Sequence, residues 1–187
     1  MKKVLLITDT WSPQINGVVN TWKNLIKISK KNDMDIKVIH PFLFFNISWP
    51  FYKEIKIPMV RYKTVVNMIK HMNPDYIHIA TEGILGWHAR NYCIKNNYSF
   101  STSYHTKFPE FLYSLYWVPK VLTYNVIRNF HNSSESTLVN TSTMKKELIS
   151  LKFTNLIEWT RGVDKEIFKP TFDKKIRNLM NPKNKEK

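Results

Sequence analysis

The stretch KVLLITDTWSPQINGVVNT, residues 3–21, decides the fold class. It begins with the apolar run of residues 3–8, continues through a polar loop, and reaches Gly17 just before a segment with helical periodicity. An apolar run that is short and continuous, rather than alternating, is typical of a strand buried on both faces. The stretch therefore predicts a buried strand, a loop and a helix in succession.

The same succession repeats along the chain. Short runs rich in β-branched and aromatic residues predict strands at residues 3–8, 36–40, 75–80, 98–104, 136–140 and 155–160. Longer segments with helical periodicity predict helices at residues 18–31, 62–72, 85–96, 118–132 and 142–151. This alternation predicts an α/β fold in which helices wrap a parallel sheet. Residues 41–60 carry three prolines and interleaved aromatics, and they predict an irregular excursion at the sheet edge.

Length and composition suit one globular domain. The chain has 187 residues, of which 43% are hydrophobic, so it can bury a sizeable core. After Pro170 the composition changes: residues 171–187 hold six Lys or Arg and two acids, which predicts a basic tail or the start of a missing second domain. We therefore expect the domain to cover residues 1–170.

Neither a secretory signal nor a membrane-spanning helix is predicted. The apolar run before Thr8 is too short for a signal peptide, and residues 41–51 are interrupted by polar residues and Pro50. The single cysteine, Cys93, has helical spacing among apolar residues, so we expect a buried hydrophobe rather than a reactive thiol. A lone cysteine also fits a reducing cytoplasm.

The formal net charge is +15, from 29 Lys and Arg against 14 Asp and Glu. Such a charge favours an anionic partner, which includes phosphates, nucleic acid and an acidic membrane surface. A solubilising surface explains the charge equally well. Nucleic-acid binding ranks last, because the sequence holds no recognised nucleic-acid-binding motif.

Glycine is rare, and all four glycines follow predicted strands: Gly17, Gly83, Gly86 and Gly162. The carboxyl ends of parallel strands surround the ligand crevice of an open sheet, and glycine there permits unusual dihedrals or a close approach to the backbone. Gly17 also precedes a helix, whose free N–H groups and dipole favour a phosphate. A plain tight turn is the alternative interpretation of Gly17.

Two more polar residues stand at predicted strand ends. His105 follows the strand at 98–104, where an imidazole can donate to a sugar hydroxyl or a developing charge. Glu82 follows the strand at 75–80; its carboxylate suits either a hydroxylated substrate or the start of a helix near Ile84. The other histidines are assigned structural positions, with His78 in the core and the rest at strand ends or helix surfaces: His40, His71, His88 and His131.

No metal site is predicted. The pair Asp33 and Asp35 superficially matches an Asp-x-Asp metal motif, but it lies in a polar turn between a predicted helix and strand. We interpret it as turn chemistry, and we expect no cofactor.

Four motifs in order give the chain a resemblance to glycosyltransferase family 4. They are TDTWSPQINGVVNT (8–21), PDYIHIATEGILGWHAR (74–90), TSYHTKFPEF (102–111) and RGVDKEIFKP (161–170). The resemblance implies the N-terminal, acceptor-binding half of the GT-B architecture, which has two Rossmann-like domains. Within the family, the chain resembles bacterial and plastid members that glycosylate lipids.

The resemblance implies roles for individual residues. It places Asn16, Gly17 and Val18 by the donor diphosphate and His105 against the transferred sugar. It also implies an acceptor-binding group, which we take as Asp9, Glu82, Tyr104, Thr106 and Lys107. Arg161 and Gly162 match the link to the second domain.

What this implies for function is a retaining, metal-independent enzyme that moves a hexose from a nucleotide-sugar to a lipid acceptor. In the family the second domain supplies most of the nucleotide-sugar site. We therefore expect this chain either to act with a separately encoded second half or to survive from a truncated gene. A domain that docks on an anionic membrane or a partner protein without catalysis is the alternative. We expect a cytoplasmic protein, peripheral on the inner face of the membrane.

The segment FLFFNISWPFYKEIK, residues 42–56, carries the membrane hypothesis. Trp49 and Phe51 would enter the bilayer interface, and Lys53 and Lys56 would face its anionic headgroups. The alternative is that these aromatics fold back as core beneath a loop.

Overall fold

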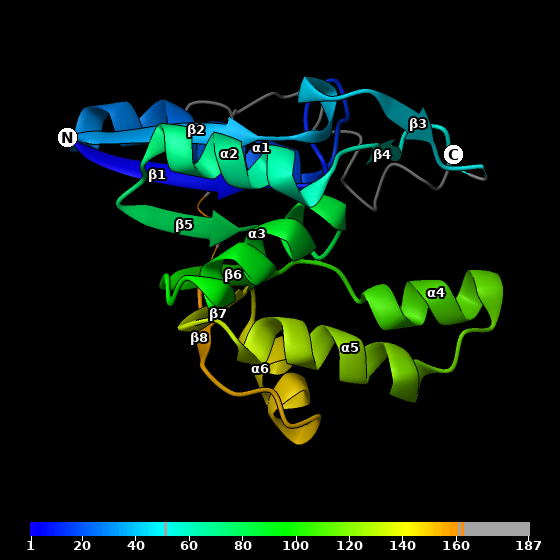
Figure 1. The fold of residues 1–187 in the computed structure, drawn as a ribbon. Coiled ribbons are helices and arrows are strands. Elements are labelled where there is room, and N and C mark those ends of the chain that lie inside the picture. The colour runs from blue at the N-terminus through cyan, green and yellow to red at the C-terminus, as the bar shows by residue number, and fades with distance from the viewer. Residues whose placement is uncertain (51, 161, 163–187) are drawn as a thin grey trace, which may run out of the picture.

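The protein is described by a computed structural model covering residues 1–50, 52–160 and Gly162 (Figure 1). Its main sheet is parallel and has the order β2-β1-β5-β6-β7-β8. The strands are β1 Lys2–Ile7, β2 Met34–Ile39, β5 Tyr76–Ile79, β6 Phe100–Tyr104, β7 Ser136–Val139 and β8 Leu156–Glu158. Each lies within two residues of a predicted strand, and the parallel α/β sheet is confirmed.

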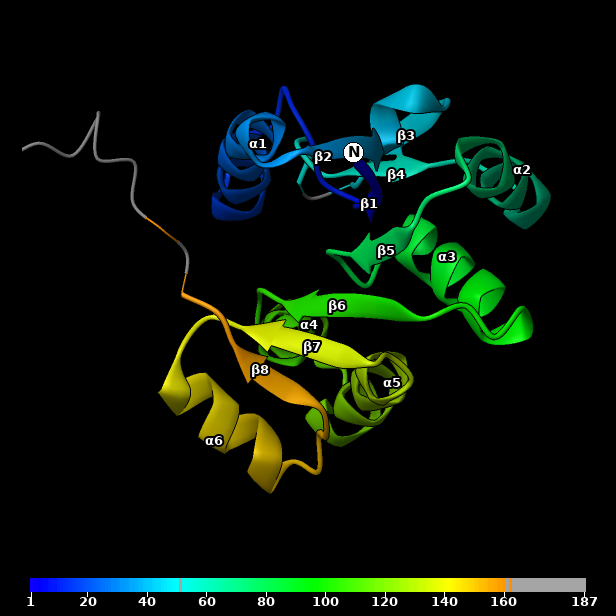
Figure 2. The ribbon, with the colours of Figure 1, turned by 90° about the vertical axis from the view of Figure 1, so that its left-hand side faces the viewer.

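Helices cover both faces of the sheet (Figure 2). In this view α1 and α6 lie on one side, whereas α2, α3 and α5 lie on the other. Their bounds are α1 Gly17–Ser29, α2 Tyr62–Met72, α3 Ile84–Lys95, α4 Phe108–Tyr116, α5 Lys120–Asn132 and α6 Ser142–Ser150. Five of these helices match predicted helices to within two residues at each end. Sequence analysis did not predict α4.

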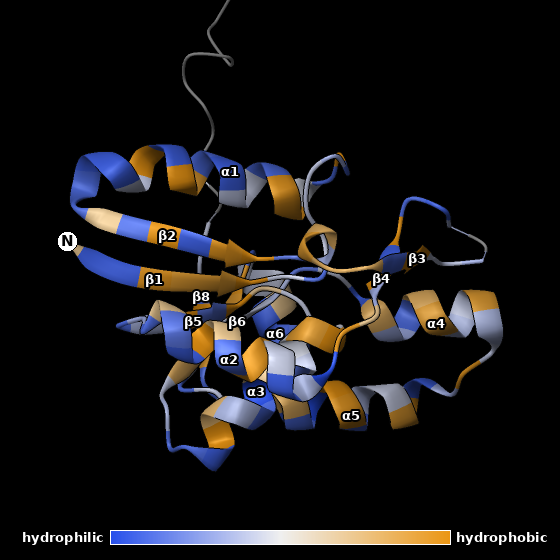
Figure 3. Cartoon of the chain, turned by 45° about the horizontal axis from the view of Figure 1, so that its top comes forward, coloured by the Kyte–Doolittle hydropathy of each residue, from blue (hydrophilic) through white to orange (hydrophobic). Residues whose placement is uncertain are grey.

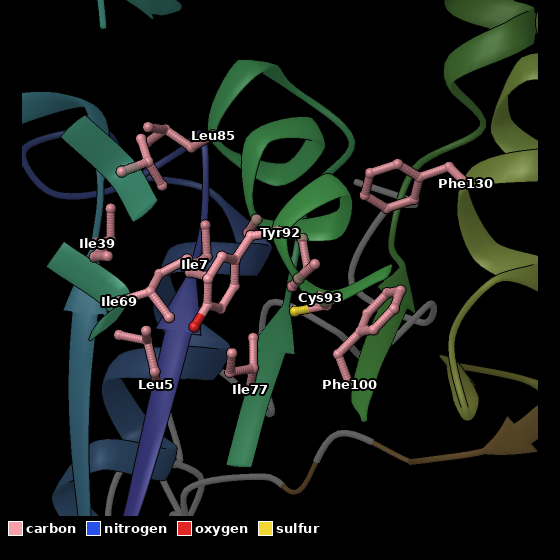
Figure 4. Packing of buried hydrophobic residues seen from close by; sticks show 13 residues of the cluster. Leu5, Ile7, Ile39, Ile69, Ile77, Leu85, Tyr92, Cys93, Phe100 and Phe130 are labelled. Atoms are coloured by element: carbon pink, nitrogen blue, oxygen red, sulfur yellow. The ribbon is translucent and has the colours of Figure 1, made fainter. Parts of the chain in front are cut away.

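The side chains of β1 show why its apolar run is continuous. Leu5 and Ile7 point to the face that packs against α2 and α3, in a cluster with Ile69 and Cys93 (Figure 4). Leu6 points to the other face and packs with Trp22 of α1. A strand with helices on both sides has no wet face, so polar alternation is lost. Cys93 is buried, as predicted.

The strand order reverses at β1. β1 pairs with β2 on one side and with β5 on the other, so the crossovers leave β1 in opposite directions. The loops that follow β1 and β5 therefore emerge next to each other at the carboxyl edge of the sheet. In open α/β sheets this switch point is where ligands bind.

Residues 41–60 form the predicted excursion, with more order than expected. A short 3₁₀ turn at Pro41–Leu43 leads into an antiparallel hairpin of β3, Asn46–Ser48, and β4, Lys56–Pro58. This hairpin is a separate small sheet beyond the carboxyl end of β2 (Figure 1). In the part of the chain that the structure describes, no helix is long and apolar enough to cross a membrane.

Candidate functional site

The loops after β1 and β5 are joined through Asp9. The Thr81 hydroxyl donates to Asp9 Oδ2 at 2.9 Å, and the Asp9 N–H donates to Thr81 Oγ1 at 2.6 Å. The carboxylate also accepts the N–H of Leu85 at 2.8 Å and that of Gly86 at 3.2 Å. These two donors belong to the first turn of α3, where helix N–H groups have no partner within the helix. Asp9 therefore caps α3 from a distant segment.

Two glycines make this capping sterically feasible. A Cβ at Gly83 would lie 2.3 Å from Asp9 Cγ, and a Cβ at Gly86 would lie 2.1 Å from the carbonyl oxygen of Thr81. Both distances are far below van der Waals contact. No described glycine has a positive φ, so close approach, and not unusual dihedrals, explains glycine at these two positions.

Burial raises the pKa of Asp9 from 3.8 to about 6. The hydrogen bonds from Leu85, Thr81 and Gly86 lower the pKa, but desolvation is the larger effect. The capping role of Asp9 was not predicted. Its predicted role in acceptor binding stays a prediction.

The N-terminus of α1 has a cap of its own. Asn16 Oδ1 accepts the N–H groups of Val18 at 3.1 Å and Val19 at 3.0 Å, and Asn16 Nδ2 donates to Thr10 Oγ1 at 2.8 Å. Gly17 is exposed at the mouth of this turn, which holds no acidic residue. A phosphate here would have to approach Gly17 or displace the Asn16 side chain. The predicted donor-diphosphate role of residues 16–18 remains a prediction.

A series of buried side-chain hydrogen bonds links α5 to the same edge. Glu82 Oε1 lies 2.9 Å from His131 Nε2, and His131 Nδ1 lies 2.9 Å from Thr102 Oγ1 on β6. Thr102 Oγ1 in turn lies 2.9 Å from Thr137 Oγ1 on β7. With the ring proton on Nε2, His131 donates to Glu82 and accepts from Thr102. This series of hydrogen bonds fixes the carboxylate of Glu82, whose side chain is 13% exposed.

The position of His131 corrects the sequence analysis, which placed it at a helix surface. The structure buries it completely, because α5 turns the face of Tyr124, Ile127 and His131 inward. The spacing of these three residues is helical, so the sequence held a signal for the burial.

His78 lies in the core between two serines, as predicted. Its Nδ1 is 2.8 Å from Ser101 Oγ and its Nε2 is 2.7 Å from Ser103 Oγ. Burial, together with the nearby His105 and His131, lowers the pKa of His78 to about 3. The ring is therefore neutral at physiological pH.

His105 directly follows β6 and is half-buried. Since β6 neighbours β5 and runs parallel to it, His105, Glu82 and Gly17 all belong to the carboxyl edge of the sheet. The strand order therefore brings the three positions to one edge, whereas the prediction that they line one crevice stays a prediction. The sugar contact of His105 stays a prediction.

The residues beside His105 differ in what surrounds them. Tyr104 is buried, and its ring contacts those of His131 and Phe153, so the structure does not support its predicted role in acceptor binding. An apolar strand end explains this, since β6 is covered on both faces. Thr106 is exposed, whereas Lys107 Nζ lies 2.7 Å from both carboxylate oxygens of Glu147.

The predicted membrane segment packs partly against α4. Trp49 is partly buried, and its Nε1–H donates to the Tyr116 hydroxyl at 2.5 Å. Lys56 donates to Ser48 Oγ across the hairpin, and Lys53 is exposed. Phe51 lies outside the described residues.

The remaining predictions concern metal and domain linkage. Asp33 has a left-handed backbone (φ 55°) directly before β2, which confirms the turn at Asp33, whereas Asp35 lies in β2 itself. Among the described residues, no group of three His, Cys, Asp or Glu is placed to hold a metal ion. Gly162 is exposed, whereas Arg161 and residues 171–187 lie outside the described residues.

Comparison with known proteins adds the family. Residues 15–167 match the description Glycosyltransferase Family 4. Sulfoquinovosyl transferase SQD2 of Arabidopsis thaliana is 28% identical over 128 residues, which cover 66% of this chain and 25% of the plant protein.

Two bacterial relatives cover more of the chain. GDP-mannose-dependent alpha-mannosyltransferases of Corynebacterium glutamicum and Mycobacterium tuberculosis are 24% and 22% identical, and each alignment covers 90% of this chain. The chain spans 45% and 50% of their respective lengths. The parallel sheet with its switch point, the polar groups at its carboxyl edge and the match over residues 15–167 agree: the chain belongs to glycosyltransferase family 4.

Proposed function

We propose that the chain is the acceptor-binding half of a hexosyltransferase that uses a nucleotide-sugar donor and a lipid acceptor. The observation that carries this proposal is the carboxyl edge of the sheet, where Glu82 is held by His131 and lies on the same edge as His105. A fixed carboxylate accepts hydrogen bonds from sugar hydroxyls, and it does so best when its own geometry is set by a buried partner.

The second half of the site comes from a second domain in this proposal. The chain covers half or less of its relatives, and the relatives' names specify GDP-mannose or sulfoquinovosyl transfer by the whole proteins. A departing diphosphate needs positive charge placed in advance. Lys107, the cation next to His105, is already paired with Glu147.

We further propose that transfer retains the anomeric configuration and needs no metal, and that the chain works peripherally at an anionic membrane. Lys53 and Lys56 of the hairpin would contribute to that contact, each by about 1 kcal/mol near a charged bilayer. The sequence relationship to SQD2, together with this basic hairpin, is the support for a lipid acceptor.

The test is reconstitution with a second domain. The chain is mixed with a second-domain half encoded in the same genome and supplied with labelled nucleotide-hexoses and a lipid extract. Labelled glycolipid should appear only when both halves are present, and it should persist in EDTA. The His105→Ala variant is the control for transfer. A reconstituted pair that binds donor and acceptor but transfers nothing would support a domain that only docks.

A further inference from the structure

Helices α4 and α5 form an antiparallel pair that extends beyond the carboxyl edge of the sheet (Figure 1). Their connection is YSLYWVPKVL, residues 113–122, which we call the α4–α5 tip. Its apolar side chains face outward: Trp117 is 78% exposed, and Val121 and Leu122 are more than half exposed. Figure 3 shows hydrophobic residues on both helices in this region. Folding of the described chain leaves this apolar surface uncovered.

The backbone at Trp117 is unusual for so large a residue. Trp117 ends α4 in the left-handed conformation (φ 55°), and its N–H closes the helix on the Tyr113 carbonyl oxygen at 3.0 Å. Glycine or asparagine is the common residue at this position of a helix end. A side chain with a Cβ is disfavoured there, and the exposed indole recovers little of that cost through burial within the chain. Such a departure points to a contact outside the chain.

The charge of the tip indicates what kind of partner it contacts. Residues 113–122 contain one lysine, Lys120, and no acidic residue. Lys120 Nζ lies 5.2 Å from the centre of the Tyr113 ring, so cation and aromatic share one face. The hairpin that carries Lys53 and Lys56 is joined to α4 through Trp49 and Tyr116. Apolar side chains flanked by lysines are typical of binding to an anionic lipid interface.

The shape of the tip favours a bilayer over a protein partner. A stable protein interface buries about 1,600 Å² and needs a complementary surface, whereas one helical turn that projects outward can enter a lipid interface alone. Tryptophan and tyrosine are also the residues enriched at membrane interfaces.

We propose that the α4–α5 tip docks the domain on anionic bilayers by inserting Trp117, Val121 and Leu122 while Lys120 contacts headgroups. The proposal rests on the proposed function only for the reason why the domain should dock. Because α4 begins just after His105, a bilayer at the tip lies on the crevice side of the sheet. A lipid acceptor would then reach Glu82 without leaving the interface.

Vesicle sedimentation tests the docking on the chain alone. We expect the chain to sediment with phosphatidylcholine vesicles that contain phosphatidylglycerol, to stay in solution with phosphatidylcholine alone, and to be released by salt. The double variant Trp117→Ala, Leu122→Ala should bind at least about tenfold more weakly, because two large apolar side chains no longer enter lipid. The matched control is Ile28→Ala, which changes a side chain of similar exposure (54%) on α1 and should bind normally.

Trp117→Gly separates docking from folding. Glycine suits the left-handed backbone, so this variant should melt at or above the wild-type temperature while its vesicle binding falls. Equal binding by wild type and the double variant, or an equal loss in Ile28→Ala, would overturn the proposal. Self-association that depends on Trp117 without any vesicle binding would also overturn it and assign the tip to a second copy of the chain. The sedimentation assay contains no nucleotide-sugar, so it tests docking alone. Transfer to a lipid dispersed in detergent tests the proposed function separately, and the two can fail independently.

Discussion

Replacing Gly86 with alanine should disrupt the carboxyl edge of the sheet. The new Cβ would lie 2.1 Å from the Thr81 carbonyl oxygen, well inside the 3.4 Å at which ordinary contact begins. The obstacle is backbone, which has no rotamer to change. Helix α3 must therefore move away, and that movement stretches the bonds from the Leu85 and Gly86 N–H groups to Asp9.

The magnitude follows from two opposing effects. Alanine favours a helix over glycine by about 1 kcal/mol. Overpacking of a well-packed site costs about 1–3 kcal/mol, and a backbone clash belongs at or above the upper end. We expect a net loss of about 2 kcal/mol of unfolding free energy, which lowers the melting temperature of a domain this size by about 4–8 °C.

Two other glycines calibrate the assay. Gly162→Ala meets no atom of the described residues within 4 Å and should leave the melting temperature unchanged. Gly83→Ala meets the Asp9 side chain, which can rotate away, so it should cost less than Gly86→Ala and should lose the Asp9 cap. Thermal unfolding followed by circular dichroism ranks the three variants. A Gly86→Ala protein as stable as wild type would refute the argument that close approach requires glycine there.

Three further predictions concern side chains at or near the same edge. His105→Ala should abolish transfer in the reconstituted enzyme with an unchanged melting temperature; full turnover would remove His105 from the site. Because folding raises the pKa of Asp9 from 3.8 to about 6, its contribution to stability is fully present below pH 3.8 and lost as pH rises through 6. Urea unfolding between pH 4 and pH 7 should therefore show a fall in wild type that Asp9→Asn lacks, and parallel profiles would contradict it. His131→Leu removes the His131 hydrogen bonds to Glu82 and Thr102 and should cost about 1–3 kcal/mol in urea unfolding, whereas Lys107→Ala removes a surface pair and should cost at most about 1 kcal/mol; equal costs would argue against the buried hydrogen-bonded series.

The strands and five helices could be predicted because each carries its own periodicity. β1 has a continuous apolar run because both of its faces are buried, and α2 has apolar residues at helical spacing because one of its faces is buried. α4 was missed for a physical reason. Its apolar residues do not form one buried stripe, since Phe108, Leu115 and Tyr113 are exposed, and Pro109 lies in its first turn. A helix whose apolar residues face outward has no periodicity directed toward the core.

The site was predictable in position but only partly in its contacts. Strand-end positions placed His105 and Glu82 at the correct edge, because the carboxyl ends of parallel strands share an edge whatever the register. The partners of these side chains were not predictable from spacing along the chain. Asp9 bonds residues about 76 positions away, and Glu82 bonds His131 across 49 positions. Such pairs depend on strand order, which no local pattern specifies.

The charges at the carboxyl edge bear on the proposed function. Glu82 presents a carboxylate, Asp9 presents a second one that is committed to α3, and His78 is neutral. A diphosphate placed against two carboxylates would be repelled, whereas the hydroxyl groups of a neutral acceptor can donate to Glu82. The N-terminus of α1 differs, because its helix dipole favours an anion and its first turn has no acidic residue. The proposed function therefore divides the edge: we expect acceptor hydroxyls beside β5 and a phosphate near Gly17.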